Sequence, residues 1–403
     1  MSRSRNTFLW MAGLSVVTLL LGVAREFAIA RELRASGAAD IFFRGLVVIG
    51  AARVFGLSLF RARWIPAPEE LPARALLSEE RGVAALITGV ALVALVPVLG
   101  LSAWAEPTPW VMAACVIAAV LGGAIRALAE RAGHERLGFA LEWGAPVGTI
   151  VGALALPGGA LGPTLGLFAG FVLGGLLLTA PALRARAGEA PWRPRPRDGA
   201  TRWLLLDTLV YVNLGLVDAL ISHVFAEGDF ALLNYAHLFV NAVLMVPTAA
   251  ATVVALRLAR RPDAHALLRR WALVGGFGIG LAVAGVAIAL LWSPVAAPIN
   301  AATGWPIAGE IHLLILLSAP FAGLRFTNTV GRQQRVATDP KSLASWDLAG
   351  LGLRVVLLIP GALTFGVLAS PVALTIAEIV QLGAWWRPSS SEWTEGSEPG
   401  APM

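Results

Sequence analysis

Long apolar stretches recur along the whole chain, and each has the length that an α-helix needs to cross a bilayer. Spanning takes roughly 17–25 predominantly apolar residues, and about twelve stretches meet that requirement. They lie near residues 7–25, 40–60, 82–104, 109–127, 138–157, 160–183, 202–225, 229–257, 267–292, 309–328, 342–359 and 364–386. Of all residues, 57% are hydrophobic and 14% are charged, which excludes a soluble globular domain. The sequence therefore predicts an all-α polytopic membrane protein.

The connections between these stretches alternate in charge. Every second connection carries several arginines. No basic residue occurs in the intervening connections at residues 105–108, 158–159, 226–228, 293–308 and 360–363. Because basic loops stay on the cytoplasmic side of a membrane, we expect both termini in the cytoplasm. The first connection, with Arg31 and Arg34, departs from this alternation, although its acidic residues nearly balance the charge.

A basic, proline-rich segment at residues 184–201 divides the chain almost in half. We expect it to be a cytoplasmic linker between an N-terminal lobe at 1–183 and a C-terminal lobe at 202–386. A polar cytoplasmic tail follows at 387–403. About six spans per half return the chain to the same side, so the lobes would be parallel repeats that enclose a central cavity and alternate its access.

Composition also excludes several functions. The net charge of +6 could suggest nucleic acid, but basic loops of a membrane protein explain the same excess. Cys115 is the only cysteine and the histidines lack ligand spacing, so we expect no metal and no cofactor. The sequence has neither a nucleophile–base pair nor paired carboxylates at a plausible site, so we do not expect an enzyme. Lys341 is the only lysine, and arginine used in its place points to a GC-rich, bacterial genome.

Charged residues in the first apolar stretches need a physical reason, since a charge at the centre of a spanning helix costs about 2.5–3.5 kcal/mol on insertion scales. Arg53 shares a helix face with Gly50 and Gly56. We expect Arg25 and Arg53 to face a common cavity and hold one anion, with Arg44 facing away. The alternative is that Arg25, Arg31 and Arg44 extend to lipid head groups or pair locally with acids. The acids available for local pairing are Glu26, Glu32 and Asp40.

The second half carries acidic and amide side chains instead. Asn234, His237 and Asn241 share one helix face. Asp218 lies so deep in its stretch that a proton, a sodium ion or a cross-helix arginine must accompany it. Asp347 shares a face with Arg354 but lies ~10 Å away along the helix, too far for direct pairing. We expect Asp218 and Asp347 to be candidates for coupling to Na⁺, H⁺ or the membrane potential.

Glu142, Glu378 and Gln381 are further polar residues within apolar stretches. We expect them to form hydrogen bonds in helix packing rather than to bind a ligand.

Three patches carry a family resemblance. They are Ala24-Arg25-Glu26 through Phe42-Phe43 with Arg53, the run at 231–238 with Val246-Pro247, and Gly331-Arg332-Gln333-Gln334 with Asp339-Pro340. Together they resemble the lipid II flippases of the MurJ type, which belong to the multidrug/oligosaccharidyl-lipid/polysaccharide (MOP) exporter superfamily. The sequence departs from that family where Leu19 and Leu238 replace cavity arginines, and the last two helices of the family are absent.

The resemblance implies two six-helix lobes around a central cavity and the flipping of a lipid-linked glycan diphosphate, a peptidoglycan or polysaccharide precursor, by alternating access. It implies that Arg25 and Arg53 bind the substrate. Secondary cavity candidates are Arg31, Asp40, Asn234, His237, Asn241 and Arg325. Membrane lipids and envelope-synthesis enzymes are the implied partners, in the bacterial inner membrane.

Two other functions remain open from the sequence. The chain could be a non-transporting scaffold in envelope synthesis, in which the replaced arginines mean a lost substrate. It could also be a drug or cation exporter of the same superfamily, which would depend on the acids of the second half. Flipping of a lipid-linked glycan in vesicles separates flippase from scaffold, and export of organic cations separates flippase from drug exporter.

Overall fold

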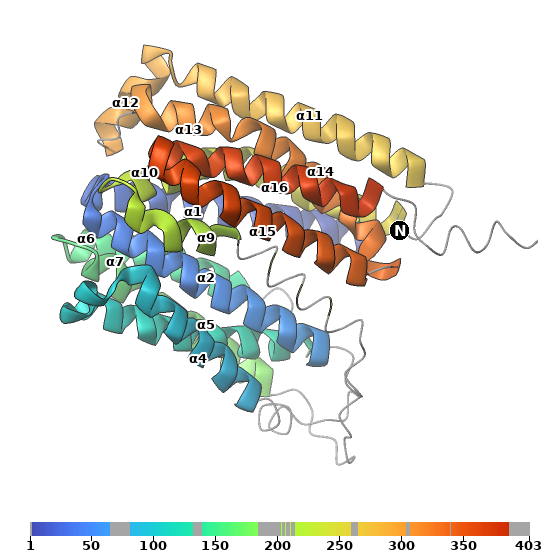
Figure 1. The fold of residues 1–403 in the computed structure, drawn as a ribbon. Helices are drawn as coiled ribbons and strands as arrows, with labels where there is room; N and C mark the ends of the chain where they lie inside the picture. Colours follow the sequence, from blue (N-terminus) through green and yellow to red (C-terminus); the bar gives the residue numbers. More distant parts are fainter. Residues whose placement is uncertain are drawn as a thin grey trace, which may run out of the picture.

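A computed structural model describes residues 2–64, 81–131, 139–183, 203, 206, 210, 214–258, 265–303, 307–338 and 340–386. Every regular element within these residues is helical (Figure 1). In the first half they are α1 (Ser2–Leu33), α2 (Gly37–Trp64), α4 (Arg81–Leu99), η1 (Leu101–Ala105), α5 (Pro107–Arg131), α6 (Phe139–Ala155) and α7 (Leu161–Leu183). The predicted linker at 184–201 and the predicted tail at 387–403 lie outside the described residues.

The second half has the same all-helical character. Its elements are α9 (Leu214–Ile221), η3 (Ser222–Val224), α10 (Asp229–Leu258), α11 (His265–Ala289), α12 (Ser293–Thr303), η5 (Ile307–Ile311), α13 (His312–Leu317), α14 (Ala319–Thr338), α15 (Pro340–Phe365), η6 (Gly366–Leu368) and α16 (Ala369–Trp386). Each apolar stretch expected from the sequence contains at least one of these helices. The short helix α12 within the 293–308 connection was not expected.

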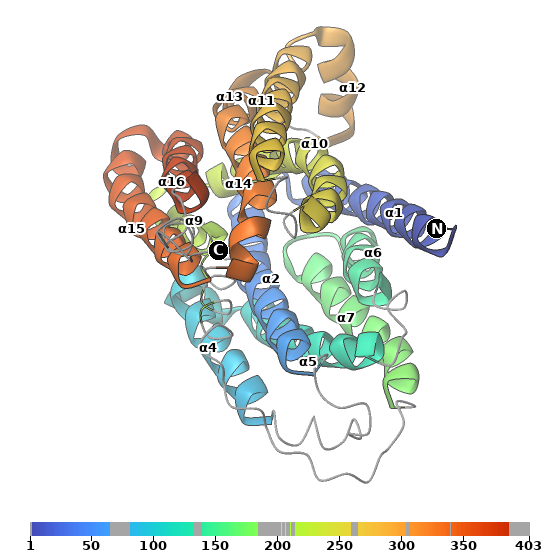
Figure 2. The ribbon, with the colours of Figure 1, turned by 90° about the vertical axis from the view of Figure 1, so that its right-hand side faces the viewer.

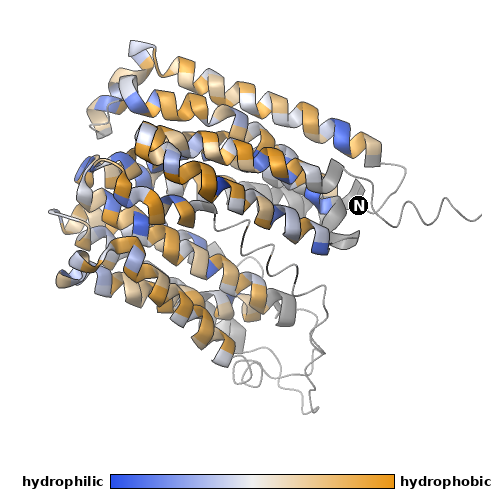
Figure 3. Ribbon diagram, in the orientation of Figure 1, coloured by the Kyte–Doolittle hydropathy of each residue, from blue (hydrophilic) through white to orange (hydrophobic). Residues whose placement is uncertain are grey.

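Seven helical stretches within the described residues are long and apolar enough to cross a membrane. Hydrophobic residues predominate along the helices in Figure 3. The shorter apolar stretches include Leu161–Leu177 of α7 and Gly215–Val224, which combines α9 with η3. The expected span at 309–328 is not one straight helix, because it is divided into η5, α13 and α14. The polytopic all-α prediction is confirmed.

Glycines set how closely helices of the first half pack. Gly144, Gly148 and Gly152 of α6 face a matching row of glycines on α7. A Cβ added to Gly148 would lie 2.1 Å from the carbonyl oxygen of Gly166, so no side chain fits there. Small residues allow helix backbones to approach in this way where lipid provides no hydrophobic driving force. The same half includes packed contacts of α5 with α7, α2 with α5, and α1 with α6.

The second half packs around α14, which contacts α10, α11 and α16, while α15 packs on α16. Figure 2 shows α2 near the centre, with α4, α5, α6 and α7 on one side and α11 to α16 on the other. Contacts between the halves are made by α1 and α2 with α10, and by α2 and α4 with α9. Helix α10 therefore lies where side chains of both halves can meet.

Candidate functional site

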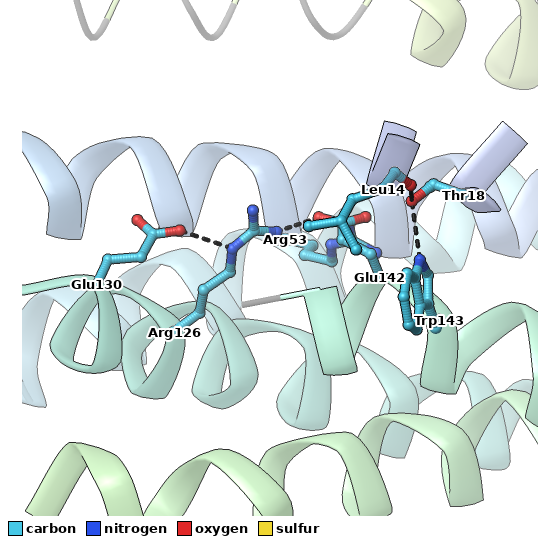
Figure 4. A network of polar contacts seen from close by, with 7 residues as sticks. All are labelled: Leu14, Thr18, Arg53, Arg126, Glu130, Glu142 and Trp143. Carbon is cyan, nitrogen blue, oxygen red and sulfur yellow. Dashed lines mark hydrogen bonds and ion pairs between the residues drawn. The ribbon is translucent and has the colours of Figure 1, made fainter. Parts of the chain in front are cut away.

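Three helices of the first half bring two arginines onto one carboxylate (Figure 4). Arg53 of α2 and Arg126 of α5 donate to different oxygens, Oε2 and Oε1, of Glu142 in the first turn of α6. Nε of Arg126 also donates to Oε1 of Glu130, 2.9 Å away. The four side chains contribute two positive and two negative charges, so the cluster is balanced. We refer to Arg53, Arg126 and Glu142 as the two-arginine site.

Close packing of α2 against α5 places these arginines beside each other. A Cβ added to Gly123 of α5 would lie 3.5 Å from the carbonyl oxygen of Arg53. Glycine at this position lets the two backbones meet just before Arg126. On α6, the indole of Trp143 donates to Oγ1 of Thr18 in α1, 3.0 Å away, and this bond fixes the helix turn that carries Glu142.

Arg25 of α1 has a different partner, since its Nε and Nη2 both donate to Oε1 of Glu26. The expectation that Arg25 and Arg53 share one anion is therefore corrected: each arginine has its own carboxylate. The physical reason is that an acid within reach already offsets the cost of each half-buried charge. For Arg25, the structure shows the local pairing with Glu26 that was one of the alternatives from the sequence. Arg31 is exposed in the last turn of α1.

The second half contains a cavity of ≈ 270 Å³ where α10 faces α2. We call it the α10 cavity. Its polar lining consists of Asp218, Asn234, His237, Asn241 and Arg325. Its apolar lining consists of Val47, Phe230, Leu233, Leu244, Phe321 and Leu374. Four of the expected secondary residues are thus gathered here, whereas Arg31 and Asp40 are not part of this lining among the described residues.

Within the α10 cavity the polar groups of α10 are uncharged hydrogen-bonding groups. Nδ2 of Asn234 donates to the carbonyl oxygen of Phe230, 2.7 Å away, which leaves its amide oxygen for a ligand. The ring of His237 lies against that of Phe321, with centroids 6.4 Å apart. Nε2 of His237 is buried without a hydrogen-bond partner among the described residues. An unsatisfied buried group of this kind is costly, and a ligand in the α10 cavity would be able to supply the missing partner.

Asp218 is neutralised by a cross-helix arginine. Nη2 of Arg354 on α15 donates to Oδ2 of Asp218, and Oγ of Ser370 donates to Oδ1 at 2.7 Å. Arg354 is fully buried. Of the three companions expected for Asp218, the structure therefore contains the arginine. Each carboxylate oxygen thus has one donor, and the coupling role expected for Asp218 stays a prediction.

The partner of Asp347 also comes from another helix. Nη2 of Arg332 on α14 donates to Oδ2 of Asp347 at 3.0 Å. The sequence-based inference that Asp347 and Arg354 each need a separate partner is confirmed. Glu378 accepts from Arg325 at 2.9 Å and from Asn328 at 2.6 Å. The expectation that Glu378 forms hydrogen bonds in helix packing is therefore confirmed.

Asp40 joins the two halves at the end of the bundle where α1 is followed by α2. Its carboxylate accepts the backbone N–H groups of Gly228 and Ala231, each at 2.8 Å, at the start of α10. A carboxylate at a helix N-terminus satisfies amides that lack partners within the helix. Gly228 has φ +90°, and a Cβ there would lie 2.7 Å from a backbone oxygen of Ala35. Asp40 therefore ties the halves together instead of lining the cavity.

Arg44 belongs to the same inter-half contact. It donates to the carbonyl oxygen of Ser222 at 3.1 Å, and Nη1 lies 3.2 Å from Nδ1 of His223. Nε2 of His223 lies 2.9 Å from the carbonyl oxygen of Pro97 in α4. We call the contacts of Asp40, Arg44 and His223 the clasp. Arg44 therefore contacts the other half directly, and the nearby charge of Asp40, the local partner expected from the sequence, also stabilises it.

Sequence reasoning missed Arg126 as a site residue and assigned Glu142 to helix packing. In the sequence, Arg126 lies at the end of an apolar stretch, where a basic residue usually marks the cytoplasmic end of a spanning helix. The one available signal was that Glu142 begins its apolar stretch as an acid without a neighbouring base. Pairing it with Arg53 required knowing that α2, α5 and α6 meet.

No protein-family model matches the sequence, and no curated protein sequence matches it. Solved structures do match. A lipid II flippase MurJ in an inward closed conformation has a TM-score of 0.68 at 14% identity, over 94% of this chain and 86% of that chain. The Vibrio cholerae MATE transporter VcmN has a TM-score of 0.63 at 15% identity, over 96% of each chain. An inward-facing multidrug resistance MATE family transporter of the MOP superfamily has a TM-score of 0.61 at 13% identity, over 96% of this chain and 100% of that chain.

Identities this low establish the fold alone. The MOP-type fold implied by the sequence resemblance is confirmed: the chain shares its fold with the lipid II flippase MurJ and with MATE transporters.

Proposed function

We propose that this protein moves a lipid-linked glycan diphosphate across the membrane by alternating access. The observation that carries the proposal is the α10 cavity, where uncharged hydrogen-bonding groups from one helix lie among aromatic and aliphatic side chains. The amide of Asn241 and the imidazole of His237 suit sugar hydroxyl groups, which need both donors and acceptors. Phe230 and Phe321 supply the apolar faces against which a sugar ring packs.

Arginines of the first half supply the complementary chemistry. Guanidinium groups bind phosphate oxygens through paired, charge-assisted hydrogen bonds. The two-arginine site is partly exposed, with Arg53 at 22% and Glu142 at 21% side-chain exposure. We propose that the diphosphate of such a substrate contacts arginines of the first half and that its glycan contacts the α10 cavity. Apolar outer helix surfaces suit its lipid tail.

A drug or cation exporter is less well supported. An uncompensated carboxylate in the cavity is the strongest attraction for an organic cation, because a charge pair in a site of low dielectric outweighs contact with the faces of Phe230 and Phe321. Asp218 is the only carboxylate in the described lining of the α10 cavity, and Arg354 already neutralises it. The scaffold alternative requires no cavity at all, and the assay below tests it.

The clasp supports alternating access. It closes the halves at one end through a few polar contacts centred on Asp40 and Arg44. Contacts of this kind can break without disrupting the apolar core of either half, which is what rocking of two lobes requires. We propose that this is the outer end, with both termini in the cytoplasm and the chain in a bacterial inner membrane alongside envelope-synthesis enzymes.

Reconstituted vesicles test the proposed function. A fluorescent short-chain prenyl diphosphate glycan is added to the inner leaflet, and loss of protection from a membrane-impermeant quencher reports flipping. We expect flipping with the wild-type chain and a loss of at least tenfold for a chain with Asn234→Leu and Asn241→Leu together. Ser345→Ala, at an exposed position on α15, is the matched control. Wild-type vesicles that flip no lipid-linked glycan would support the scaffold function instead.

Topology is tested separately in intact cells. A cysteine at position 300 in α12 should react with an impermeant thiol reagent added outside, in a Cys115→Ala background. Protection of position 300 from outside would reverse the proposed orientation.

A further inference from the structure

We propose that Glu142 is a built-in competitor for the substrate: it occupies a phosphate-binding site formed by Arg53 and Arg126 and leaves that site when a diphosphate binds. The identity of the ligand rests on the proposed function, but the two-arginine site itself does not. The proposal adds Arg126 to the binding residues and gives Glu142 a regulatory role.

Convergence of two guanidinium groups on one acid is the first observation. Arg53 and Arg126 come from different helices, and each donates to its own oxygen of Glu142 (Figure 4). A diphosphate presents several such acceptor oxygens with a larger negative charge. It can therefore satisfy both arginines at once and with stronger charge-assisted bonds than a single carboxylate.

Preorganisation is the second observation. Arg126 keeps its orientation through the 2.9 Å bond from Nε to Glu130, and this bond does not involve Glu142. When Glu142 leaves, two positive charges and the one negative charge of Glu130 remain. The site then has a net positive charge, which favours a multivalent anion over chloride or a monovalent lipid phosphate.

Accessibility is the third observation, because Glu142, at 21% side-chain exposure, is more exposed than the paired carboxylates of Glu26, Glu378 and Asp347. The side chains of Arg53 and Glu142 are 22% and 21% exposed, whereas Arg354 and Asp218 are 0% and 4% exposed. A carboxylate that is partly exposed loses less on separating from its arginines than one that is fully buried, so Glu142 can leave its partners more readily. Asp218 lines the α10 cavity but is only 4% exposed and accepts from both Arg354 and Ser370, so it is held more firmly than Glu142.

Binding of inorganic pyrophosphate to the purified full-length chain in detergent tests the proposal by calorimetry. We expect Glu142→Gln to bind pyrophosphate at least tenfold more tightly than the wild-type chain, because the competitor has lost its charge. Glu142→Asp, which keeps the charge but shortens the side chain, should give a smaller gain. Adding Arg126→Gln to Glu142→Gln should remove the gain. Glu106→Gln, which removes one negative charge at an exposed position just before α5, is the matched control and should change pyrophosphate affinity less than twofold.

Several outcomes would overturn the proposal. One is a Glu142→Gln chain that melts near the wild-type temperature but binds pyrophosphate no more tightly. Another is a gain that persists after Arg126→Gln. Geranyl diphosphate and inorganic phosphate serve as further probes: equal affinity for phosphate and pyrophosphate would show that a second phosphate makes no contact, and would contradict the two-arginine geometry.

The vesicle assay keeps the two proposals distinguishable. If pyrophosphate binds as expected but no lipid-linked glycan is flipped, the anion site stands and the transport function fails. If flipping occurs and Glu142→Gln leaves pyrophosphate binding unchanged, the transport function stands and the competitor role fails.

Discussion

Replacing either member of the Arg354–Asp218 pair should destabilise the protein, but with a different dependence on pH. Asp218→Asn leaves the guanidinium of Arg354 fully buried without its counter-charge. Arginine cannot lose its proton in a protein, so that charge persists at every accessible pH. Breaking a buried pair in this way costs about 3–5 kcal/mol. We expect this loss at both pH 7 and pH 5.

Arg354→Met leaves a carboxylate instead, and a carboxylate can take up a proton. For an ordinary aspartate the protonation costs about 4 kcal/mol at pH 7 and about 1.5 kcal/mol at pH 5, at 1.36 kcal/mol per pH unit. These values set an upper limit on the part of the Arg354→Met penalty that comes from the unpaired charge, because the carboxylate can take up a proton instead. The penalty should thus fall by up to about 2.7 kcal/mol as the pH drops from 7 to 5.

Unfolding of each variant and of the wild-type chain in mixed detergent micelles at both pH values measures these differences. Each variant is compared with the wild type at the same pH, which cancels the titration of all other groups. Ser370→Ala removes a 2.7 Å hydrogen bond to the same carboxylate and should cost about 1.5–3 kcal/mol. An Asp218→Asn chain as stable as the wild type, with pH dependence of transport abolished, would refute the structural role and restore Asp218 as a coupling acid.

Three further predictions follow from the helix contacts. Asp40→Asn removes the charge from the start of α10 and should cost about 0.5–2 kcal/mol, with increased outer-end cysteine accessibility as the measurement. His223 accepts from Arg44, which can only donate, so His223→Leu should loosen the clasp and raise outer-end cysteine accessibility, whereas Ser345→Ala on α15 should leave it unchanged. Gly148→Leu should prevent stable folding in a thermal melt, since even a Cβ would lie 2.1 Å from a backbone oxygen, whereas Gly89→Leu, with nothing within 4 Å, should melt like the wild type.

The sequence by itself determined the all-helical membrane fold, because the need to satisfy every backbone group in lipid leaves apolar stretches of this length one solution. Periodicity and helix rise also established that Asp347 and Arg354 need separate partners. A local pair such as Arg25 with Glu26 could also be predicted from the sequence, because its members are adjacent.

Only the tertiary structure decided which charges meet across helices. Arg53 and Glu142 are 89 residues apart, and Arg354 and Asp218 are 136 residues apart. Periodicity predicts the face on which a residue lies but not the helix that covers that face. The two-arginine site depends on the close approach of α2 and α5 at Gly123, and the clasp on the placement of the α10 N-terminus over Asp40. Such contacts depend on the packing of whole helices, and no local sequence pattern specifies that packing.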